Sequence, residues 1–236
     1  MNVAVLISGN MRTADLCVES IKEHVYARLP LMSIPKTDLC RQDYATYAAT
    51  AADEDAHKIE LFPRVLGMTE PQPHMDEKNY AASLGLGCYG VQVVLRQLWA
   101  LRRAWQIMEG DGYRPDWVIR LRPDCYFLND IENLANYDPI GIYVPTFHNF
   151  HGLNDRFAFG GYEAMRIYCN RLDNMDEYVA AGRVFQPESH LKWTLWEKHK
   201  ISVGRTRVLF DLVRKGGKHV KPEWNKDADY GDVTEV

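Results

Sequence analysis

Hydrophobic and polar positions alternate most clearly in residues 117–122, Trp-Val-Ile-Arg-Leu-Arg. The run is apolar and partly β-branched with a period of two, which predicts a β-strand. Residues 3–8 form a second, almost wholly apolar run, which is typical of a strand buried on both faces of a parallel sheet. We therefore expect these two strands to be neighbours or near neighbours in the centre of one sheet.

A helical pattern covers residues 91–108, where apolar side chains recur at spacings of four and three residues. Gly110 and Gly112 end it, and residues 115–116 lead straight into the strand at 117–122. Helix, short turn and strand make up half of a right-handed βαβ unit. The side chains expected to face inward are Val94, Leu98, Leu101, Trp105 and Met108.

Weaker patterns predict the other elements, all joined by short polar connections. One helix is expected over 14–29, with Thr13 as its N-cap and with Leu16, Ile21 and Val25 facing inward. The remaining expectations are a helix over 42–52, strands over 58–66, 140–145 and 157–160, helices over 162–172 and from 186 onward, and one or two strands within 201–213.

The strand at 117–122 stops abruptly at Arg122-Pro123-Asp124, because Pro123 has no N–H to offer a sheet ladder. In open α/β sheets, ligands bind outside the carboxyl ends of the strands. A carboxylate that follows two arginines at this edge is therefore a candidate site. The plainer interpretation is a surface ion pair of Asp124 with Arg120 or Arg122, which contributes little.

Composition narrows the class of protein. The chain has 236 residues, of which 46% are hydrophobic and 25% charged, as in one globular domain; we assign it to residues 1–214 and regard 215–236 as a polar tail. A net charge of −4 provides no basic field for a nucleic-acid backbone. No apolar run resembles a signal peptide or reaches membrane-spanning length, and the five scattered cysteines suit a reducing compartment, so a cytoplasmic protein is expected.

Residues 85–90, Gly-Leu-Gly-Cys-Tyr-Gly, match the dinucleotide-binding pattern G-x-G-x-x-G, and a helix follows them. That fingerprint also needs a strand immediately before it, so that the pyrophosphate meets a helix N-terminus at a strand end. Residues 76–83 are polar and unlike a strand. The match therefore favours a loop near the ligand over a nicotinamide site.

Four segments resemble glycosyltransferases of the GT-A fold: residues 3–12 (VAVLISGNMR), 116–127 (DWVIRLRPDCYF), 154–160 (NDRFAFG) and 186–191 (QPESHL). They are similar to a group of small bacterial and viral glycosyltransferase-like proteins with an R-x-R-P-D strand end. The resemblance follows the order of elements over most of the chain more than residue identity. It implies one α/β domain of GT-A type, with a mixed, mainly parallel central sheet flanked by helices.

The resemblance also implies an activity: transfer of a sugar from a nucleoside-diphosphate sugar to a hydroxyl of a glycan or glycoconjugate acceptor. The implied donor-binding residues are Ser8, Gly9, Asn10, Arg12, Arg120, Arg122 and Asp124. Where this fold usually has D-x-D, the chain has Arg122-Pro123-Asp124. Asp124 then occupies the position of the usual ligand of Mn²⁺ or Mg²⁺, whereas Arg122 offers a direct bidentate contact to a diphosphate.

The acceptor side needs a carboxylate to take the hydroxyl proton. Glu188, at a predicted helix start where the dipole favours ionisation, resembles the acidic residue of GT-A enzymes, and Asp155 is its competitor. A simple capping role for Glu188 stays open. The polar loop 146–156 and the following helix start supply the expected acceptor-binding residues, which are His148, Asn154, Arg156 and His190.

Two other classes remain. A non-catalytic module that binds a sugar nucleotide or a glycan would keep the fold and show neither transfer nor donor hydrolysis. An oxidoreductase that used Gly85–Gly90 would bind a nicotinamide cofactor instead of a uridine or guanosine nucleotide.

Overall fold

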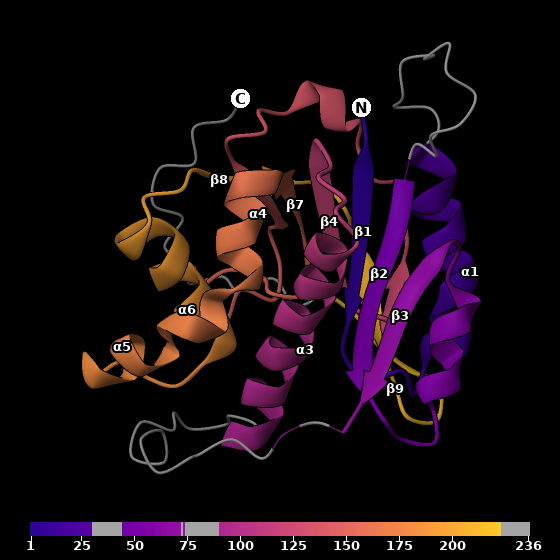
Figure 1. Ribbon diagram of the computed structural model, residues 1–236, viewed down its shortest axis with the longest axis horizontal. Helices are drawn as coiled ribbons and strands as arrows, with labels where there is room; N and C mark the ends of the chain where they lie inside the picture. Colours follow the sequence, from indigo (N-terminus) through magenta and orange to yellow (C-terminus); the bar gives the residue numbers. More distant parts are fainter. Residues whose placement is uncertain (30–43, 72, 74–89, 223–236) are drawn as a thin grey trace.

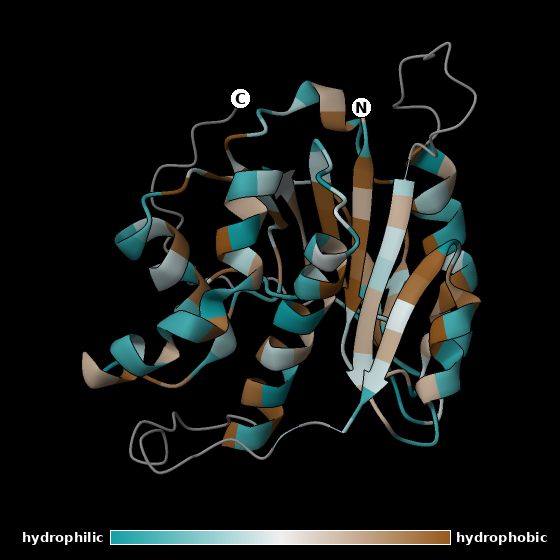
Figure 2. Cartoon of the chain, viewed as in Figure 1, coloured by the Kyte–Doolittle hydropathy of each residue, from teal (hydrophilic) through white to brown (hydrophobic). Residues whose placement is uncertain are grey.

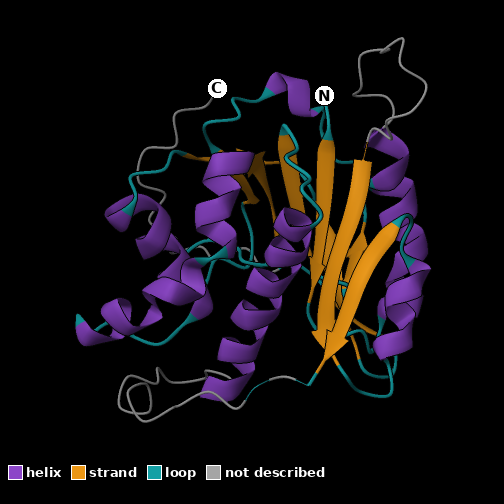
Figure 3. Ribbon diagram, viewed as in Figure 1, coloured by secondary structure: helices purple, strands orange, loops and turns teal. Residues whose placement is uncertain are grey.

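The computed structural model describes residues 1–29, 44–71, 73 and 90–222. Its centre is a seven-stranded sheet, and a three-stranded sheet packs beside it (Figure 1). Helices lie along both faces of the strands (Figure 3). The strands are β1 (Val3–Ser8), β2 (Tyr44–Ala51), β3 (Val65–Glu70), β4 (Trp117–Leu121), β5 (Cys125–Phe127), β6 (Ile142–Pro145), β7 (Phe157–Gly161), β8 (Val203–Thr206), β9 (Phe210–Arg214) and β10 (Lys218–Val220).

The helices connect these strands and cover them. The short turns η1, η2, η4 and η5 are 3₁₀-helical, and η6 is a π-helical turn that continues α6. The bounds are α1 (Ala14–His24), η1 (Tyr26–Arg28), η2 (Ala56–Leu61), α3 (Val91–Gly110), η4 (Leu134–Asn136), α4 (Tyr162–Cys169), η5 (Arg171–Asn174), α5 (Met175–Ala180), α6 (Pro187–Lys192) and η6 (Trp193–Lys198).

The large sheet has the strand order β3-β2-β1-β4-β7-β6-β8. All its pairings are parallel except the two made by β7. A mixed, mainly parallel sheet between helices, as expected from the sequence, is therefore confirmed. The expected adjacency of the two central strands is also confirmed, because β1 and β4 pair in parallel with Val3 opposite Trp117.

β1 is buried on both faces and is mostly brown in Figure 2. Val3, Val5 and Ile7 point into a core shared with α1 and the small sheet. Ala4 and Leu6 point into the opposite core, shared with α3 and α4. An almost continuous apolar run is what a strand needs when neither of its faces meets water.

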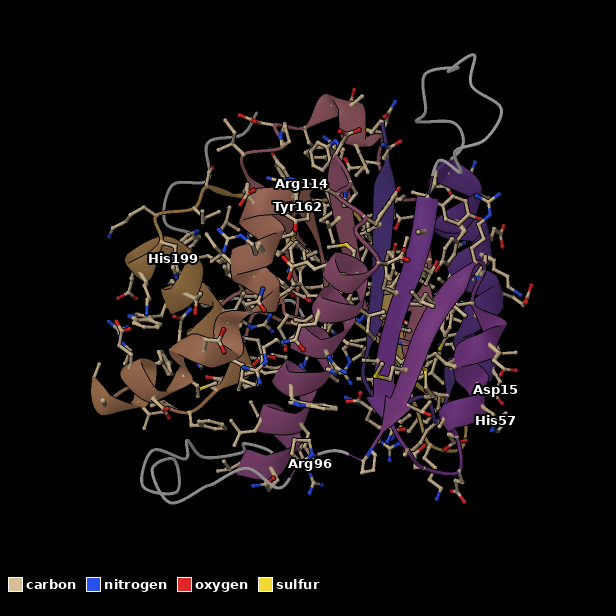
Figure 4. All side chains as sticks on the ribbon, in the orientation of Figure 1. Asp15, His57, Arg96, Arg114, Tyr162 and His199 are labelled. Carbon is tan, nitrogen blue, oxygen red and sulfur yellow. The ribbon has the colours of Figure 1, made fainter. Side chains whose placement is uncertain are left out.

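α3 covers β1 and β2 and buries all five side chains expected to face inward, which confirms the helix. Its amino end lies at the same edge as the carboxyl ends of β2 and β3, at the bottom of Figure 1. Arg96, near that amino end, is labelled at this edge in Figure 4. Arg114 and Tyr162 lie at the opposite edge, where the guanidinium is 4.7 Å from the ring centroid.

The second strand of the sheet was wrongly expected to be a helix over 42–52. Residues 44–51 form β2, which pairs with β1 from Val3↔Tyr44 to Ser8↔Ala49. Its alanines favour a helix in isolation, but small side chains also fit beneath a packed helix, and pairing within the sheet overrides the local preference. The strand expected over 58–66 is likewise wrong: η2 occupies its first part, and β3 begins only at Val65.

Three smaller expectations need correction. Leu16 of α1 is exposed, whereas Ile21 and Val25 are buried as expected. Thr13 does not cap α1 with its side chain; its hydroxyl donates instead to the carbonyl of Val213 in β9. Residues 218–220 are not part of a loose tail, because they form β10, which pairs with β9.

A tight contact in the sheet provides a test of the fold. A Cβ added to Gly161, at the end of β7, would lie 2.2 Å from the carbonyl oxygen of Pro139. We expect Gly161→Ala to lower the free energy of unfolding by about 1–3 kcal/mol, the range for overpacking. Gly110→Ala is the matched control, since an added Cβ meets nothing within 4 Å there. Denaturant titration of both variants checks this, and equal stabilities would contradict the described packing.

Candidate functional site

The candidate site lies at the carboxyl ends of β1 and β4. In the strand order β3-β2-β1-β4 the chain runs outward from β1 in both directions, so these ends are the switch point at which α/β sheets bind ligands. Gly9 follows β1 with a φ of 136°, and a Cβ added there would lie 3.3 Å from Cδ of Pro123. The two strand ends therefore meet on one edge, as expected from the sequence.

Asp124 is held by arginines from two different sheets. Nε and Nη2 of Arg122 donate to its two carboxylate oxygens, each at 2.8 Å. Nη1 of Arg214, at the end of β9, lies 3.5 Å from Oδ2. Burial acts to raise the pKa of Asp124, but the charges of Arg122, Arg214 and Arg156 outweigh it and hold the pKa below its usual range. The carboxylate is therefore ionised at neutral pH.

Gln97 of α3 links this pair to a second carboxylate. Its side-chain oxygen accepts from Arg122 at 3.2 Å, and its nitrogen donates to Oδ2 of Asp155 at 2.6 Å. Asp155 is fully buried, with Arg156 3.5 Å and Arg171 3.9 Å from its oxygens. Burial raises the pKa of Asp155, but the arginine charges more than offset this and lower it overall.

Arg156 connects Asp155 to Glu188. Its Nη1 donates to Oε1 of Glu188 at 3.0 Å, and its guanidinium lies 5.3 Å from the ring centroid of Phe150. Glu188 is buried and near Asp155; both effects outweigh the attraction of Arg156 and raise the pKa of Glu188 to about 7. The expectation that the helix start favours an ionised Glu188 is therefore wrong, because burial outweighs the dipole of a short helix.

The loop that carries Arg156 is held in an unusual conformation. His148, Phe150 and His151 have positive φ values of 52°, 41° and 65°, a region that non-glycine residues rarely adopt and that clusters at functional sites. Within the described part of the chain, neither ring nitrogen of His148 has a hydrogen-bond partner, although the residue is only 2% exposed. Burial and two nearby arginines lower the pKa of His148 to about 4, so the ring is neutral.

The loop packs directly on the start of α6. The N–H of Leu153 donates to the carbonyl of Glu188 at 3.1 Å, and a Cβ on Gly152 would lie 2.0 Å from that carbonyl. Asn154 is fully buried: its Oδ1 accepts from the N–H of Arg156, and its Nδ2 donates to the carbonyl of Phe147. The loop and the start of α6 are therefore brought together, as the sequence suggested.

The structure thus gathers Arg122, Asp124, Asp155, Arg156 and Glu188, the charged centre of the expected site, into one linked group. Other expected site residues have different surroundings. Arg120 is fully buried, where it donates to the main-chain oxygen of Asp155, and Asn154 shapes the loop. His190 is buried against the rings of Tyr178 and Trp193. These three residues are buried and not placed to contact a ligand directly.

The residues expected after β1 also differ in exposure. Ser8 is buried at the end of the strand, whereas Asn10 and Arg12 are exposed. Oδ1 of Asn10 accepts from the N–H of Arg12, and the carbonyl of Arg12 accepts from Lys58. Of the glycine run, only Gly90 lies within the described residues, as the N-cap of α3; residues 85–89 lie outside them.

Sequence reasoning missed three members of the group, Gln97, Arg171 and Arg214. Arg214 follows Asp124 by ninety residues and lies at the end of β9, so no local pattern joins them. Gln97 gave one weak signal, because it is a polar residue between Val94 and Leu98 on the buried side of α3. Its lack of charge made it easy to overlook.

A divalent metal on Asp124, implied by the resemblance, does not fit this donor set. Both oxygens of Asp124 accept hydrogen bonds from Arg122. No group of three or more His, Cys, Asp or Glu side chains in the described ranges is placed to hold a metal ion. The linked group has more positive than negative members: Arg120, Arg122, Arg156, Arg171 and Arg214 against Asp124, Asp155 and Glu188. Its surplus of positive charge suits an anion.

Fold and site together define an α/β protein with an arginine-rich cluster of charged side chains at the carboxyl edge of its sheet. The chain belongs to the family described as "Domain of unknown function (DUF7796)", whose model matches residues 100–224 and so includes β4, the loop before β7, α6 and β9. Comparison with curated proteins gives no match. None of the described helices is both long and apolar enough to cross a membrane.

The raised pKa of Glu188 leads to a test by pH. The folded state keeps a proton on Glu188 up to about pH 7, whereas the unfolded chain loses it near 4.5, so this residue's contribution to stability is lost as pH rises across that range. Glu188→Gln cannot titrate. The variant's melting temperature relative to wild type should therefore rise between pH 5 and pH 8, by the equivalent of roughly 1–3 kcal/mol.

The comparison with wild type removes the effect of the buried histidines, which titrate in both proteins. Glu19→Gln, at an exposed position, is the control and should follow the wild-type profile. Parallel profiles for wild type and Glu188→Gln would show that Glu188 ionises as freely in the folded protein as in the unfolded chain.

Proposed function

We propose that the protein is a glycosyltransferase that moves a sugar from a nucleoside-diphosphate sugar to a hydroxyl of a glycan or glycoconjugate. One observation carries the proposal: an arginine-rich anion site at the switch point of the sheet is linked through Arg156 to a carboxyl group that titrates near neutral pH. The arginines suit the binding of a diphosphate, and the carboxyl group suits the removal of a proton from an acceptor hydroxyl. Helices on both faces of a mainly parallel sheet agree with the GT-A resemblance of the sequence.

On the donor side, departure of a nucleoside diphosphate leaves negative charge on the outer phosphate. Guanidinium groups fixed beforehand stabilise that charge as it develops, without reorganisation during the reaction. Arg122 is fixed by two hydrogen bonds to Asp124 and a third to Gln97. In this proposal Asp124 orients Arg122 and Arg214 and does not itself touch the sugar.

On the acceptor side, a general base works best when its pKa lies near the working pH. Glu188, with a pKa of about 7, meets this condition. Asp155 does not, because its pKa is lowered and its oxygens already face Gln97, Arg156 and Arg171. The proposal therefore assigns proton removal to Glu188, with Arg156 holding the side chain, and assigns Asp155 a structural role.

The alternative is a module that binds a sugar nucleotide or glycan without turnover. The pairing of Glu188 with Arg156 favours it, since a base must release its partner, or share it, to accept a proton. A module of this kind would bind the donor tightly and neither transfer nor hydrolyse the sugar. Assays of a panel of nucleotide sugars with oligosaccharide acceptors separate the two.

Turnover in two carboxylate variants tests the assignment. If Glu188 is the base, Glu188→Gln should lower kcat by about 10²–10⁴-fold, the usual contribution of proton transfer, with the donor Kd almost unchanged. The fold should survive, since glutamine keeps an oxygen for Arg156. Steady-state kinetics and donor titration calorimetry give both numbers.

Asp155→Asn is the matched comparison, because it also replaces a buried carboxylate by its amide. Its main effect should be a lower melting temperature, since Arg156 and Arg171 lose a common counter-charge. Full turnover in Glu188→Gln would refute the base assignment. A loss of turnover in Asp155→Asn at unchanged stability would transfer that role to Asp155.

A further inference from the structure

We infer that the chain binds a diphosphate through Arg122 and Arg214 without a divalent cation, and that Arg214 is the second arm of this clamp. The choice of a diphosphate as ligand rests on the proposed function, whereas the metal-free mode of binding rests on the geometry around Asp124. The inference departs from the D-x-D resemblance, in which a metal carries the phosphates.

Asp124 and the two arginines that contact it differ in their exposure to solvent. The side chains become more exposed in the order Asp124 (11%), Arg122 (19%) and Arg214 (36%). The carboxylate therefore lies innermost, and the guanidinium groups lie nearer to solvent. Both guanidinium groups are thus partly open to an arriving anion.

Asp124 lacks the further oxygen ligands that a divalent cation needs. Mg²⁺ needs near-octahedral oxygen coordination and Ca²⁺ six to eight oxygen ligands. The other two carboxylates of the group already accept from Gln97 and Arg156. A cation on Asp124 would also lie within a few ångströms of two guanidinium groups, where repulsion is strong in a partly buried setting.

The linked group of arginines and carboxylates carries a net positive charge. Five arginines against three carboxylates leave a surplus of two positive charges in the linked group, and three when Glu188 is protonated. A buried surplus is costly unless an ion of opposite sign compensates it. The ionised phosphates of a sugar nucleotide supply that compensation, and a metal–diphosphate complex supplies less of it.

A separate observation points to a ligand. Nε of Arg156 and both ring nitrogens of His148 lack hydrogen-bond partners among the described residues, although both side chains are more than nine-tenths buried. The carbonyl of His148 lies 3.4 Å from Nη1 of Arg156, so these groups adjoin. The Nε–H of Arg156 and the single N–H of the neutral His148 ring provide further donors beside the arginine pair, which a multiply charged oxyanion can use.

Arg214 was not among the site residues expected from the sequence. The small sheet fixes its position. The N–H of Val213 donates to the carbonyl of Asp124 at 2.8 Å, and β9 pairs with β5 immediately after Asp124. The backbone that carries Arg214 is thus bonded directly to the backbone that carries Asp124. The guanidinium therefore reaches the carboxylate without needing a ligand to order it.

The experiment is calorimetric titration of inorganic pyrophosphate, and of uridine and guanosine diphosphates, into the full chain. Each titration is made in EDTA and again with excess Mn²⁺, corrected for complexes formed in solution. Pyrophosphate and at least one nucleotide should bind in EDTA, and Mn²⁺ should change their Kd less than about threefold. Arg214→Ala should weaken binding at least about tenfold, as expected when a hydrogen bond to a charged group is lost.

Two further variants make the test specific. Lys215→Ala removes one positive charge at the next, exposed position and should leave Kd unchanged. Arg214→Lys keeps the charge without the planar fork and should recover only part of the affinity. Melting temperatures close to wild type would show that the variants fold.

The inference is overturned if pyrophosphate and the nucleotides bind only when Mn²⁺ is present, if none of them binds, or if Lys215→Ala weakens binding as much as Arg214→Ala. Its failure is distinct from that of the proposed function. Sugar transfer that requires Mn²⁺ would refute the metal-free clamp and leave the glycosyltransferase proposal intact. Metal-free pyrophosphate binding without transfer from any nucleotide sugar would support the clamp and remove the glycosyltransferase proposal.

Discussion

The rest of the site depends on the interactions of the buried Asp155 carboxylate with the polar side chains around it. Gln97 of α3, Arg171 of η5 and the neighbouring Arg156 face its oxygens, and Arg120 of β4 donates to its main-chain carbonyl. One buried charge thus connects the helices on one face of the sheet with a central strand. Burying it is costly, and the arginines compensate that cost only while all of them stay in place.

From that centre the charged groups extend outward in a chain to both halves of the site. Gln97 and Arg122 lead to Asp124 at the end of β4, and Arg156 leads to Glu188 at the start of α6. Burial and the charge of Asp155 raise the pKa of Glu188, and the attraction of Arg156 offsets them only in part. The hydrogen bonds of this chain are buried or partly buried, where they are stronger than in water.

Under the proposed function, an arginine at the position of the first aspartate of D-x-D changes the chemistry of the strand end. Two carboxylates would recruit a metal ion to the phosphates, whereas Arg122 would supply the positive charge itself, with Asp124 orienting it. The guanidinium is planar and always charged, so it recognises phosphate oxygens with fixed geometry. The loop near Arg156 has left-handed backbone at His148 and Phe150. Backbone strain of this kind persists only where the surrounding structure enforces it, and it clusters at functional sites.

The sequence by itself determined the elements whose patterns are strong and local. These are β1, the strand β4 with its stop at Pro123, and the buried face of α3, because an uninterrupted apolar run or a strict helical period has few alternative interpretations. It did not determine β2, whose alanines favour a helix until β1 offers a parallel edge. Only the tertiary structure decided that Arg214 from β9 reaches Asp124 and that Glu188 stays protonated to near pH 7. Both depend on charges and burial contributed by segments far apart in the chain, which no local pattern records.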